Sequence, residues 1–315
     1  MKTLGLSQEG AFGLLAMGTA LPPRRSVEEL AQEAGYDEAM VERLLGGGLR
    51  EVPIAPPGSL AALAAVAAEP VVDRVGPHRI GAFVLAHSMP SVAPVDTPFL
   101  EDIAQRANVP PVPSIAVSGQ PCAILHAALK LAGAWSRTLP ADQCVLLIGA
   151  DRAYTPRQRI FFGSAMGDAA VALAVGRHTD EHRVLASFHH TNVLATRGEL
   201  SPWEKIAAFR EQNPMLIRSA LVSCLAQAGR TLDDVALIVP HTPYLSIWDA
   251  VARLARFPRE RILTDYIGET GHLNSNDSFV HYDHAVRENR VKPGELALLV
   301  NPGFGGTRGC TLIRR

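Results

Sequence analysis

Cysteine is scarce in this chain, and its spacing excludes two common uses of the residue. The 315 residues include Cys122, Cys144, Cys224 and Cys310, of which no two are closer than 22 positions. Zinc sites of the CxxC type and small disulfide-bonded scaffolds both need closely spaced cysteines. We therefore expect four reduced thiols.

An excess of one sign of charge is also missing. Lysine and arginine total 30 against 31 for aspartate and glutamate, which gives a formal net charge of -1. Proteins that bind nucleic acids or anionic lipids usually carry a basic excess. The composition, with 47% hydrophobic and 19% charged residues, excludes a disordered or coiled-coil chain. The sequence thus predicts a folded globular protein with neither a nucleic acid nor a membrane as its partner.

Long hydrophobic runs are absent as well. No segment approaches the roughly 18 apolar residues that a membrane-spanning helix requires. Near the N-terminus, Gln8 and Glu9 interrupt the apolar stretch that a signal peptide would need. We expect a cytoplasmic protein.

The sequence does contain a regular alternation of short apolar runs with longer Ala/Leu-rich segments of helical spacing. This pattern is typical of a layered α/β fold. The expected strands are residues 10–18, 80–88, 113–119, 143–150, 169–176, 182–191, 235–241 and 295–303, with 311–315 as a terminal edge strand. The expected helices are residues 26–35, 59–72, 122–135, 213–229, 245–257 and 278–289.

Two Gly-rich segments suggest that the chain has two related halves. Residues 161–176 and 301–315 each combine apolar strands with a turn of small residues, and each closes a series of strands and helices. This faint repetition places a boundary near residue 178. The first half is then residues 1–178 and the second is residues 179–315.

Cys122 is the candidate nucleophile. It lies where an apolar strand, a turn with Gly119 and Pro121, and a helix follow one another. Backbone N–H groups and the dipole at the start of a helix favour a thiolate, which is the reactive form of cysteine. The alternative is a small buried core residue. The other three cysteines fall in or beside strands or within a helix, and we assign them to packing.

His241 stands at the end of an apolar strand and before a helix. Ligand sites of α/β proteins gather at such strand ends. A neutral imidazole there can take a proton from a thiol or donate a hydrogen bond to a thioester carbonyl. The alternative is a polar residue that only ends the strand.

His272 and Asp277 lie in a stretch rich in Gly, Asn and Ser that precedes a helix. Five positions do not share a helical face, so the two side chains can meet only through a loop. Asp277 can orient a histidine, as the acid of a nucleophile–base–acid triad does, or it can cap the helix. A metal site formed with His281, Asp283 and His284 is disfavoured, because no third ligand has a standard spacing. We expect no metal.

Residues 301–309, NPGFGGTRG, form a Gly-rich turn. A phosphate-binding loop would be followed by a helix with Lys and Ser or Thr, which is missing here. Glycines also permit tight turns whose N–H groups point at a developing oxyanion.

Six segments in sequence order resemble the thiolase-fold condensing enzymes, specifically the ketoacyl-acyl-carrier-protein synthase III group and its acyltransferase relatives. The segments are GTALPPRR, GLREVPIAPP, QPCAILHAAL, FFGSAMGDAAVALAVG, IVPHTPYLSIWDAVARL and NPGFGGTRGCTLIRR. The second is similar to the family's GIRER segment, the fourth to its FGDGAGAAVL segment and the fifth to its PHQAN segment.

The resemblance implies a five-layer α-β-α-β-α fold built from two related halves, and a homodimer. It also implies that Cys122 takes an acyl group, as a thioester, from coenzyme A or from the phosphopantetheine arm of an acyl carrier protein. No permanently bound cofactor is implied. The oxyanion hole would use the N–H of Cys122 and that of Phe304 or Gly305.

One departure from the family bears on the reaction. Synthase III members carry GNxSxAS, whose Asn assists decarboxylation, whereas this chain has GHLNSNDS with His272 at the Asn position. The segment resembles the GHxxxxD variant of acyltransferases in secondary metabolism. That resemblance implies a triad in which Cys122 attacks, His241 moves the proton and Asp277 orients the histidine.

We therefore expect an acyltransferase that passes an acyl group from Cys122 to a small-molecule or carrier-bound acceptor, in secondary metabolite, polyketide or specialised fatty acid biosynthesis. A Cys-His-His set also serves decarboxylating enzymes, so Claisen condensation with a malonyl thioester stays open. A non-catalytic partner subunit and a thioesterase are further alternatives. The sequence leaves the acyl chain, the acceptor and the type of donor undetermined.

Overall fold

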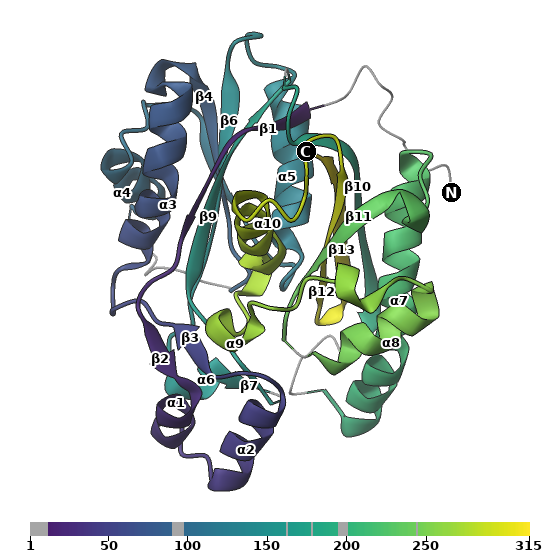
Figure 1. The fold of residues 1–315 in the computed structure, drawn as a ribbon. Coiled ribbons are helices and arrows are strands. Elements are labelled where there is room, and N and C mark those ends of the chain that lie inside the picture. The colour runs from purple at the N-terminus through teal and green to yellow at the C-terminus, as the bar shows by residue number, and fades with distance from the viewer. Residues whose placement is uncertain (1–11, 90–97, 162, 178, 195–200, 244) are drawn as a thin grey trace.

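The computed structural model describes residues 12–89, 98–161, 163–177, 179–194, 201–243 and 245–315 (Figure 1). Across these ranges, no helix combines the length and the apolar character needed to cross a membrane.

Nine strands form one mixed sheet in the order β11-β12-β13-β10-β1-β9-β6-β4-β5. Five of them come from the first part of the chain: β1 (Phe12–Ala20), β4 (Ile80–Ala86), β5 (Ser114–Val117), β6 (Cys144–Asp151) and β9 (Ala169–Gly176). β4 is parallel to β5 and β6, whereas β9 is antiparallel to β6 and β1. β6 and β9 are buried at every position, because this part of the sheet is covered on both faces.

The second part of the chain supplies β10 (Arg183–Leu194), β11 (Val235–Pro240), β12 (Leu296–Gly303) and β13 (Gly305–Arg314). β13 is antiparallel to β10 and β12, and β11 is parallel to β12. This series of pairings is the same as in β1-β9-β6-β4. The two sets join where Phe12 pairs with Val184 and Gly13 with Arg183. The boundary expected at residue 178 falls outside the described residues, and the division into halves stays a prediction.

The expectation of a terminal edge strand is wrong. β13 lies between β12 and β10 inside the sheet. The Gly-rich turn at Gly303–Gly305 folds β13 back onto β12, and its other edge then pairs with β10.

Helices and sheet alternate in five layers (Figure 1). α3 (Leu60–Val75) and α4 (Phe99–Arg106) cover one outer face, while α7 (Trp203–Gln227) and α8 (Ser246–Ala255) cover the other. α5 (Ile124–Ser136) and α10 (Asp277–Arg287) fill the centre between the two parts of the sheet. The α/β thiolase-like fold is thereby confirmed.

Three buried apolar clusters hold these layers together. One unites α3 with the first part of the sheet, a second surrounds α5 and α10, and a third lies between α7, α8 and the second part of the sheet. α7 begins ten residues before the expected start at 213 and passes through Pro214. The expected start rested on Asn213 as an N-cap, but α7 already includes this residue within its interior.

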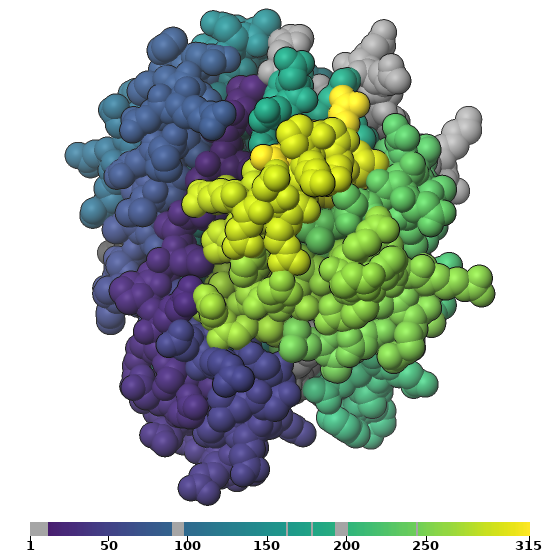
Figure 2. Space-filling view, in the orientation of Figure 1, coloured from purple at the N-terminus to yellow at the C-terminus, as the bar shows by residue number. Residues whose placement is uncertain are grey.

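The remaining elements form a cap at one end of the molecule. They are β2 (Arg24–Ser26), α1 (Val27–Glu33), α2 (Glu38–Gly46), β3 (Glu51–Pro53), α6 (Pro156–Arg159), β7 (Ile160–Phe161), β8 (Ser164–Ala165) and α9 (Ile267–Thr270). Short 3-10 helices occupy Pro77–Arg79, Leu232–Asp234, Arg259–Arg261 and Asn274–Asn276. Ile267 and Leu245 pack into the apolar core of this cap. Figure 2 shows the purple N-terminal segment lying against the green C-terminal half.

Candidate active site

Cys122 lies between the end of β5 and the start of α5, as the sequence predicted. It is buried, and its backbone is left-handed with φ of 57°. Non-glycine residues rarely adopt this conformation, which costs roughly 1–2 kcal/mol. Because the first N–H groups of a helix have no partner within the helix, the thiol sits in a favourable place for negative charge.

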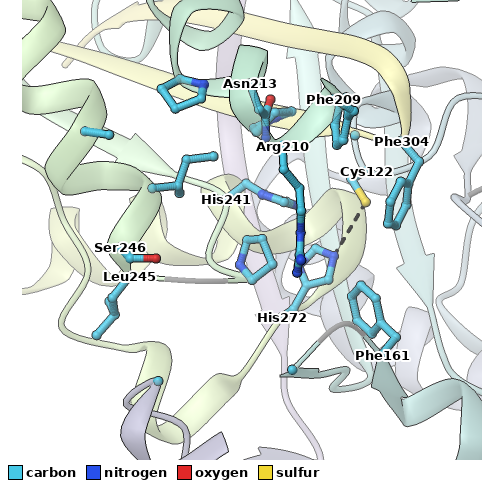
Figure 3. Close-up of a pocket in the computed structure, with 18 of the residues that line it drawn as sticks. Cys122, Phe161, Phe209, Arg210, Asn213, His241, Leu245, Ser246, His272 and Phe304 are labelled. Carbon is cyan, nitrogen blue, oxygen red and sulfur yellow. Dashed lines mark hydrogen bonds between the residues drawn. The ribbon is translucent and has the colours of Figure 1, made fainter. Parts of the chain in front are cut away.

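His272 connects Cys122 to Asp277. Its Nε2 lies 3.5 Å from the sulfur of Cys122, and its Nδ1 lies 2.5 Å from Oδ2 of Asp277 (Figure 3). All three side chains are buried. The three residues therefore form a continuous nucleophile–base–acid relay.

The expected pairing of Asp277 with His241 is wrong. Asp277 bonds His272 instead, because the 3-10 helix Asn274–Asn276 folds the five-residue connection back on itself. Asp277 also accepts the backbone N–H groups of Leu273, at 2.6 Å, and Thr242, at 3.1 Å. These bonds fix the carboxylate beneath His272, so the predicted meeting of His272 and Asp277 through a loop is confirmed.

Charge stabilises this relay. Burial alone would lower the pKa of His272, but the charges of Asp277 and Cys122 raise it to about 10. Burial would likewise raise the pKa of Asp277, but His272 lowers it to about 2. At neutral pH, His272 is thus an imidazolium held between the carboxylate of Asp277 and the sulfur of Cys122.

His241 stands beside the relay at the end of β11. Its ring lies edge-on to that of His272, with centroids 4.3 Å apart. Neither ring nitrogen has a hydrogen-bond partner within the part of the chain that the structure describes. Burial, and then the positive charge of His272, lower the pKa of His241 well below its usual value. His241 is therefore a neutral base whose nitrogens are available to a substrate.

Of the residues expected to form the oxyanion hole, Cys122 and Phe304 both line the pocket. The N–H of Cys122 donates to Oγ of Ser88 at 3.3 Å. Gly303 lies so close to the carbonyl of Pro121 that a side chain at 303 would collide with it. Phe304 lines the pocket next to Cys122, and Gly305 has φ of 75°. An oxyanion hole made by Cys122 with Phe304 or Gly305 stays a prediction.

Two buried polar residues that we did not identify from the sequence, Asp151 and His126, hold the residues of the site in place through hydrogen bonds. Asp151 accepts the N–H of Ser88 at 2.7 Å and the hydroxyl of Ser275 at 2.9 Å. It thereby links the residue that touches Cys122 to the loop between His272 and Asp277. The sequence signal that could have identified Asp151 is its position directly after the apolar run of residues 143–150.

His126 forms the other support, one helical turn after Cys122. Its Nδ1 is 2.8 Å from Oγ1 of Thr311, and its Nε2 is 3.2 Å from Oδ1 of Asn301. The amide nitrogen of Asn301 donates to the carbonyls of Asn274 and Ser275. The amide oxygen must therefore accept from Nε2, which leaves Nδ1 to accept from Thr311. Burial lowers the pKa of His126 to about 3, so the ring is neutral as this network requires.

A cavity of about 820 Å³ opens onto Cys122, His241 and His272. Its walls come from the cap, α7, α8 and the Gly-rich turn (Figure 3). Aromatic and aliphatic side chains predominate, among them Phe161, Phe209, Phe304, Leu245 and Ile206. Such a site is shaped for a mostly apolar ligand that must reach the sulfur.

Three ligand atoms suitable for a metal also meet here. The sulfur of Cys122 and one ring nitrogen each of His241 and His272 lie within 4.8 Å of one another. Zinc binds such groups, but only when they are deprotonated. His272 donates from Nδ1 to Asp277 and has a raised pKa, so a metal would have to displace the proton on Nε2. His281, by contrast, bonds the hydroxyl of Thr270 and stands outside this cluster.

The layers, the strand order and the buried Cys, His and Asp residues at the sheet centre define a thiolase-fold protein with a thiol site. Residues 225–315 match the family described as 3-oxoacyl-[acyl-carrier-protein (ACP)] synthase III C terminal. The chain as a whole is similar to beta-ketoacyl-[acyl-carrier-protein] synthase III proteins over nearly their full length.

Two curated relatives illustrate the similarity. The chain is 29% identical to beta-ketoacyl-[acyl-carrier-protein] synthase III of Rhizorhabdus wittichii, with 96% of this chain and 98% of the relative aligned. It is 26% identical to 3-oxopimeloyl-[acyl-carrier-protein] synthase of Rhodothermus marinus, with 96% and 93% aligned.

Solved structures share the fold. A structure titled ChlB3 aligns with a TM-score of 0.82 at 22% identity, covering 96% of this chain and 97% of that one. The 3-oxoacyl-[acyl-carrier-protein] synthase III of Aquifex aeolicus aligns with a TM-score of 0.80 at 22% identity, covering 96% and 100%.

Proposed function

We propose that this protein is a ketoacyl synthase III-like acyltransferase. In this proposal, Cys122 takes an acyl group from acyl-coenzyme A or an acyl carrier protein and passes it to an acceptor. The relay of Cys122, His272 and Asp277 is the observation that carries the proposal, because it places a buried thiol beside a histidine that a carboxylate orients. The similarity to synthase III relatives supports a thioester donor.

The first step forms the acyl-enzyme. The thiolate of Cys122 attacks the thioester carbonyl, the bond between that carbon and the donor sulfur breaks, and the departing thiolate takes the proton from Nε2 of His272. Donors at the predicted oxyanion turn would hold the negative oxygen, and one such donor is typically worth about 3–4 kcal/mol of barrier.

The second step discharges it. His241 accepts the proton of the acceptor hydroxyl or amine, the new bond to the acyl carbon forms, and the thiolate of Cys122 leaves. The proton then passes from His241 to the adjacent ring of His272, which restores the starting thiolate–imidazolium pair. In this scheme His272 takes the place beside Asp277 that we expected His241 to occupy.

We assign the segment from Gly271 to Asp277 to the GHxxxxD variant on the same grounds. The variant's defining His and Asp, here His272 and Asp277, are hydrogen-bonded to each other. We further propose an enzymatic role in secondary metabolite, polyketide or specialised fatty acid biosynthesis, as the resemblance to that variant implies.

A homodimer belongs to the proposal as well. β5 is an edge strand of the sheet, and its Ile115 is 37% exposed. An edge strand with exposed apolar side chains needs a partner or a cover.

Decarboxylative Claisen condensation is the second candidate. Two imidazoles, those of His241 and His272, face the sulfur of Cys122, and both could hold a malonyl thioester carbonyl. A thioesterase, which would pass the acyl group from Cys122 to water, and a non-catalytic partner subunit are the further alternatives, and the intact relay disfavours the partner subunit.

Intact-protein mass spectrometry tests the proposal. The protein and its Cys122→Ala variant are incubated with a panel of acyl-coenzyme A and acyl-carrier donors, with and without a chelator. A mass gain that needs Cys122 and survives chelation supports the acyl-enzyme. Malonyl thioester is then added: carbon dioxide release selects condensation, whereas inertness selects transfer to another acceptor. No adduct with any donor would make the partner-subunit alternative the better account.

A further inference from the structure

Cys122, His241 and His272 bring three metal-binding atoms together in the pocket. The sulfur and one nitrogen from each ring lie within 4.8 Å of one another, and all three side chains are buried. One thiol and two imidazoles form a donor set that Zn²⁺ and chemically similar cations prefer. The residues stand before α5, after β11 and after α9, so no short spacing motif in the sequence could indicate the cluster.

One edge of this triangle already has the dimensions of a zinc site. Zinc bonds of about 2.3 Å to sulfur and about 2.1 Å to nitrogen, in tetrahedral geometry, place those two ligand atoms about 3.6 Å apart. The sulfur of Cys122 and Nε2 of His272 are 3.5 Å apart. Figure 3 shows these two atoms facing each other, with His241 beside them.

His241 is able to supply the third bond. Neither of its ring nitrogens has a hydrogen-bond partner among the residues that the structure describes, although the side chain is buried. Buried polar atoms without a partner are rare in folded proteins and point to a missing ligand. Because the ligand atom of His241 is at most 4.8 Å from the other two, an approach of about 1 Å completes the tetrahedral edges.

Asp277 gives His272 the support that metal-bound histidines usually have. Nδ1 of His272 donates to Oδ2 of Asp277 at 2.5 Å, which leaves Nε2 facing the sulfur. Histidines that bind a metal almost always donate their other ring N–H to a carboxylate, a carbonyl or water. All three ligand residues also line the cavity, so a fourth coordination position is open to water.

We propose that Cys122, His241 and His272 bind Zn²⁺, or another divalent cation that prefers sulfur and nitrogen, as a reversible inhibitor of the enzyme. The metal bonds Sγ of Cys122, Nε2 of His272 and one ring nitrogen of His241. The proton on Nε2, with any on the sulfur, is released to solvent, and nothing is oxidised or reduced.

The metal takes no part in acyl transfer. The inhibition, though not the binding, rests on the proposed function, in which the acyl group occupies the same sulfur. An acylated Cys122 has no thiolate to offer, so the metal and the acyl group exclude each other.

Cobalt spectroscopy tests the site directly. Untagged protein is dialysed against a chelator and titrated with Co²⁺, a coloured substitute for zinc in tetrahedral sites. We expect a single equivalent to bind, with the intense visible bands of tetrahedral cobalt and the near-ultraviolet band of a cobalt–thiolate bond. Added Zn²⁺ should remove both signals, whereas Mg²⁺, which prefers oxygen ligands, should not.

Variants locate the bound metal. Cys122→Ala should abolish the thiolate band, and Asp277→Asn should weaken cobalt binding about 10- to 100-fold, the usual effect of removing the partner of a metal-bound histidine. His241→Asn should weaken it more strongly, because a ligand is lost. Cys144→Ala, which removes a buried thiol of β6 outside the cluster, should keep the full spectrum. Circular dichroism identifies any variant that fails to fold.

Zinc should also block acylation. Protein loaded with Zn²⁺ should show no mass gain with a donor that acylates the metal-free protein, and excess EDTA should restore the gain. Acyl-enzyme that is prepared first and then freed of donor should not develop the cobalt–thiolate band.

Two results would overturn the proposal without touching the proposed function. The first is cobalt bound without a thiolate band, or with a band that persists in folded Cys122→Ala. The second is acylation at the same rate with and without zinc. A cobalt–thiolate site that needs Cys122, in a protein that no donor acylates, would instead support the metal site and remove the proposed function.

Discussion

The carboxylate of Asp277 accepts a hydrogen bond from His272 at 2.5 Å, whereas burial and the charge of His272 lower the pKa of the neighbouring His241. One histidine is therefore charged and the other uncharged, although their rings are in contact. Pairs of titratable groups whose environments separate their pKa values are typical of sites that need both an acid and a base.

Asp277→Asn should slow acylation of Cys122. Without the carboxylate, buried His272 loses the charge that keeps it protonated, and its ring loses its orienting partner. We expect the acylation rate to fall by about 10²- to 10⁴-fold, in line with loss of the acid from a triad. Rapid-quench mass spectrometry measures this rate. Asp283→Asn, which alters another buried aspartate that bonds Thr19 and Arg287, is the matched control. An unchanged rate in Asp277→Asn would remove the relay from the mechanism.

His272→Asn and His241→Asn should affect different steps. The first removes the group that touches both Cys122 and Asp277, so the acyl-enzyme should form slowly. The second leaves the relay whole, so acylation should stay within a few-fold of normal while discharge to the acceptor falls about 10²- to 10⁴-fold. Single-turnover measurements of each step separate the two. The reverse pattern would support the order Cys122, His241, Asp277 that the sequence suggested.

The protein should lose stability as pH falls from about 6.5 to 4. Burial, the larger cause in each case, lowers the pKa of His126 to about 3 and that of His281 to about 4, against about 6.5 in an unfolded chain. In this window the unfolded state binds more protons, so the free energy of unfolding decreases by up to about 1.4 kcal/mol per pH unit for each histidine.

The charged pair does not oppose this trend. The stabilisation from His272 is fully present below about 6.5 and is lost only as pH rises through about 10. That from Asp277 is present above about 3.9 and is lost as pH falls through about 2. Urea titrations at several pH values measure the slope, and His126→Gln should reduce it by close to one proton. A flat profile between pH 4 and 6.5 would contradict the neutral state of these histidines.

Gly303→Ala should damage the site and the fold together. A Cβ at this position would collide with the carbonyl of Pro121, next to Cys122, so the Gly-rich turn and the cysteine loop would have to separate. Overpacking of this kind usually costs about 1–3 kcal/mol. Thermal denaturation and the acylation rate are the measurements. Gly46→Ala, in α2 with open space around it, should leave stability unchanged or slightly higher. Normal acylation in a stable Gly303→Ala protein would show that the two loops need not touch.

Much of this arrangement was open to prediction because it is local. The turn before Cys122 and the strand end before His241 are both visible as short patterns of apolar and turn-forming residues. The partner of Asp277 was not predictable in this way, since His241 follows strand β11 and His272 follows helix α9, and only the folded chain decides which ring lies next to the carboxylate.

Residues that act through long-range contacts could not be predicted from the sequence for the same reason. His126 meets Asn301 across 175 positions, and Ser88 meets Cys122 across 34. In the sequence, His126 is an isolated polar residue in an Ala/Leu-rich helix, and no neighbouring residue indicates its hydrogen-bond partner.

The left-handed backbone at Cys122 positions the nucleophile but lowers the stability of the fold. Glycine adopts this conformation without the penalty that a side chain incurs, so Cys122→Gly should relax the turn even as it removes the nucleophile. An inactive variant that unfolds at a higher temperature than the parent would be the sign of that conflict. The fold thus keeps the thiol on a strained backbone, and the rest of the chain must be stable enough to maintain that conformation.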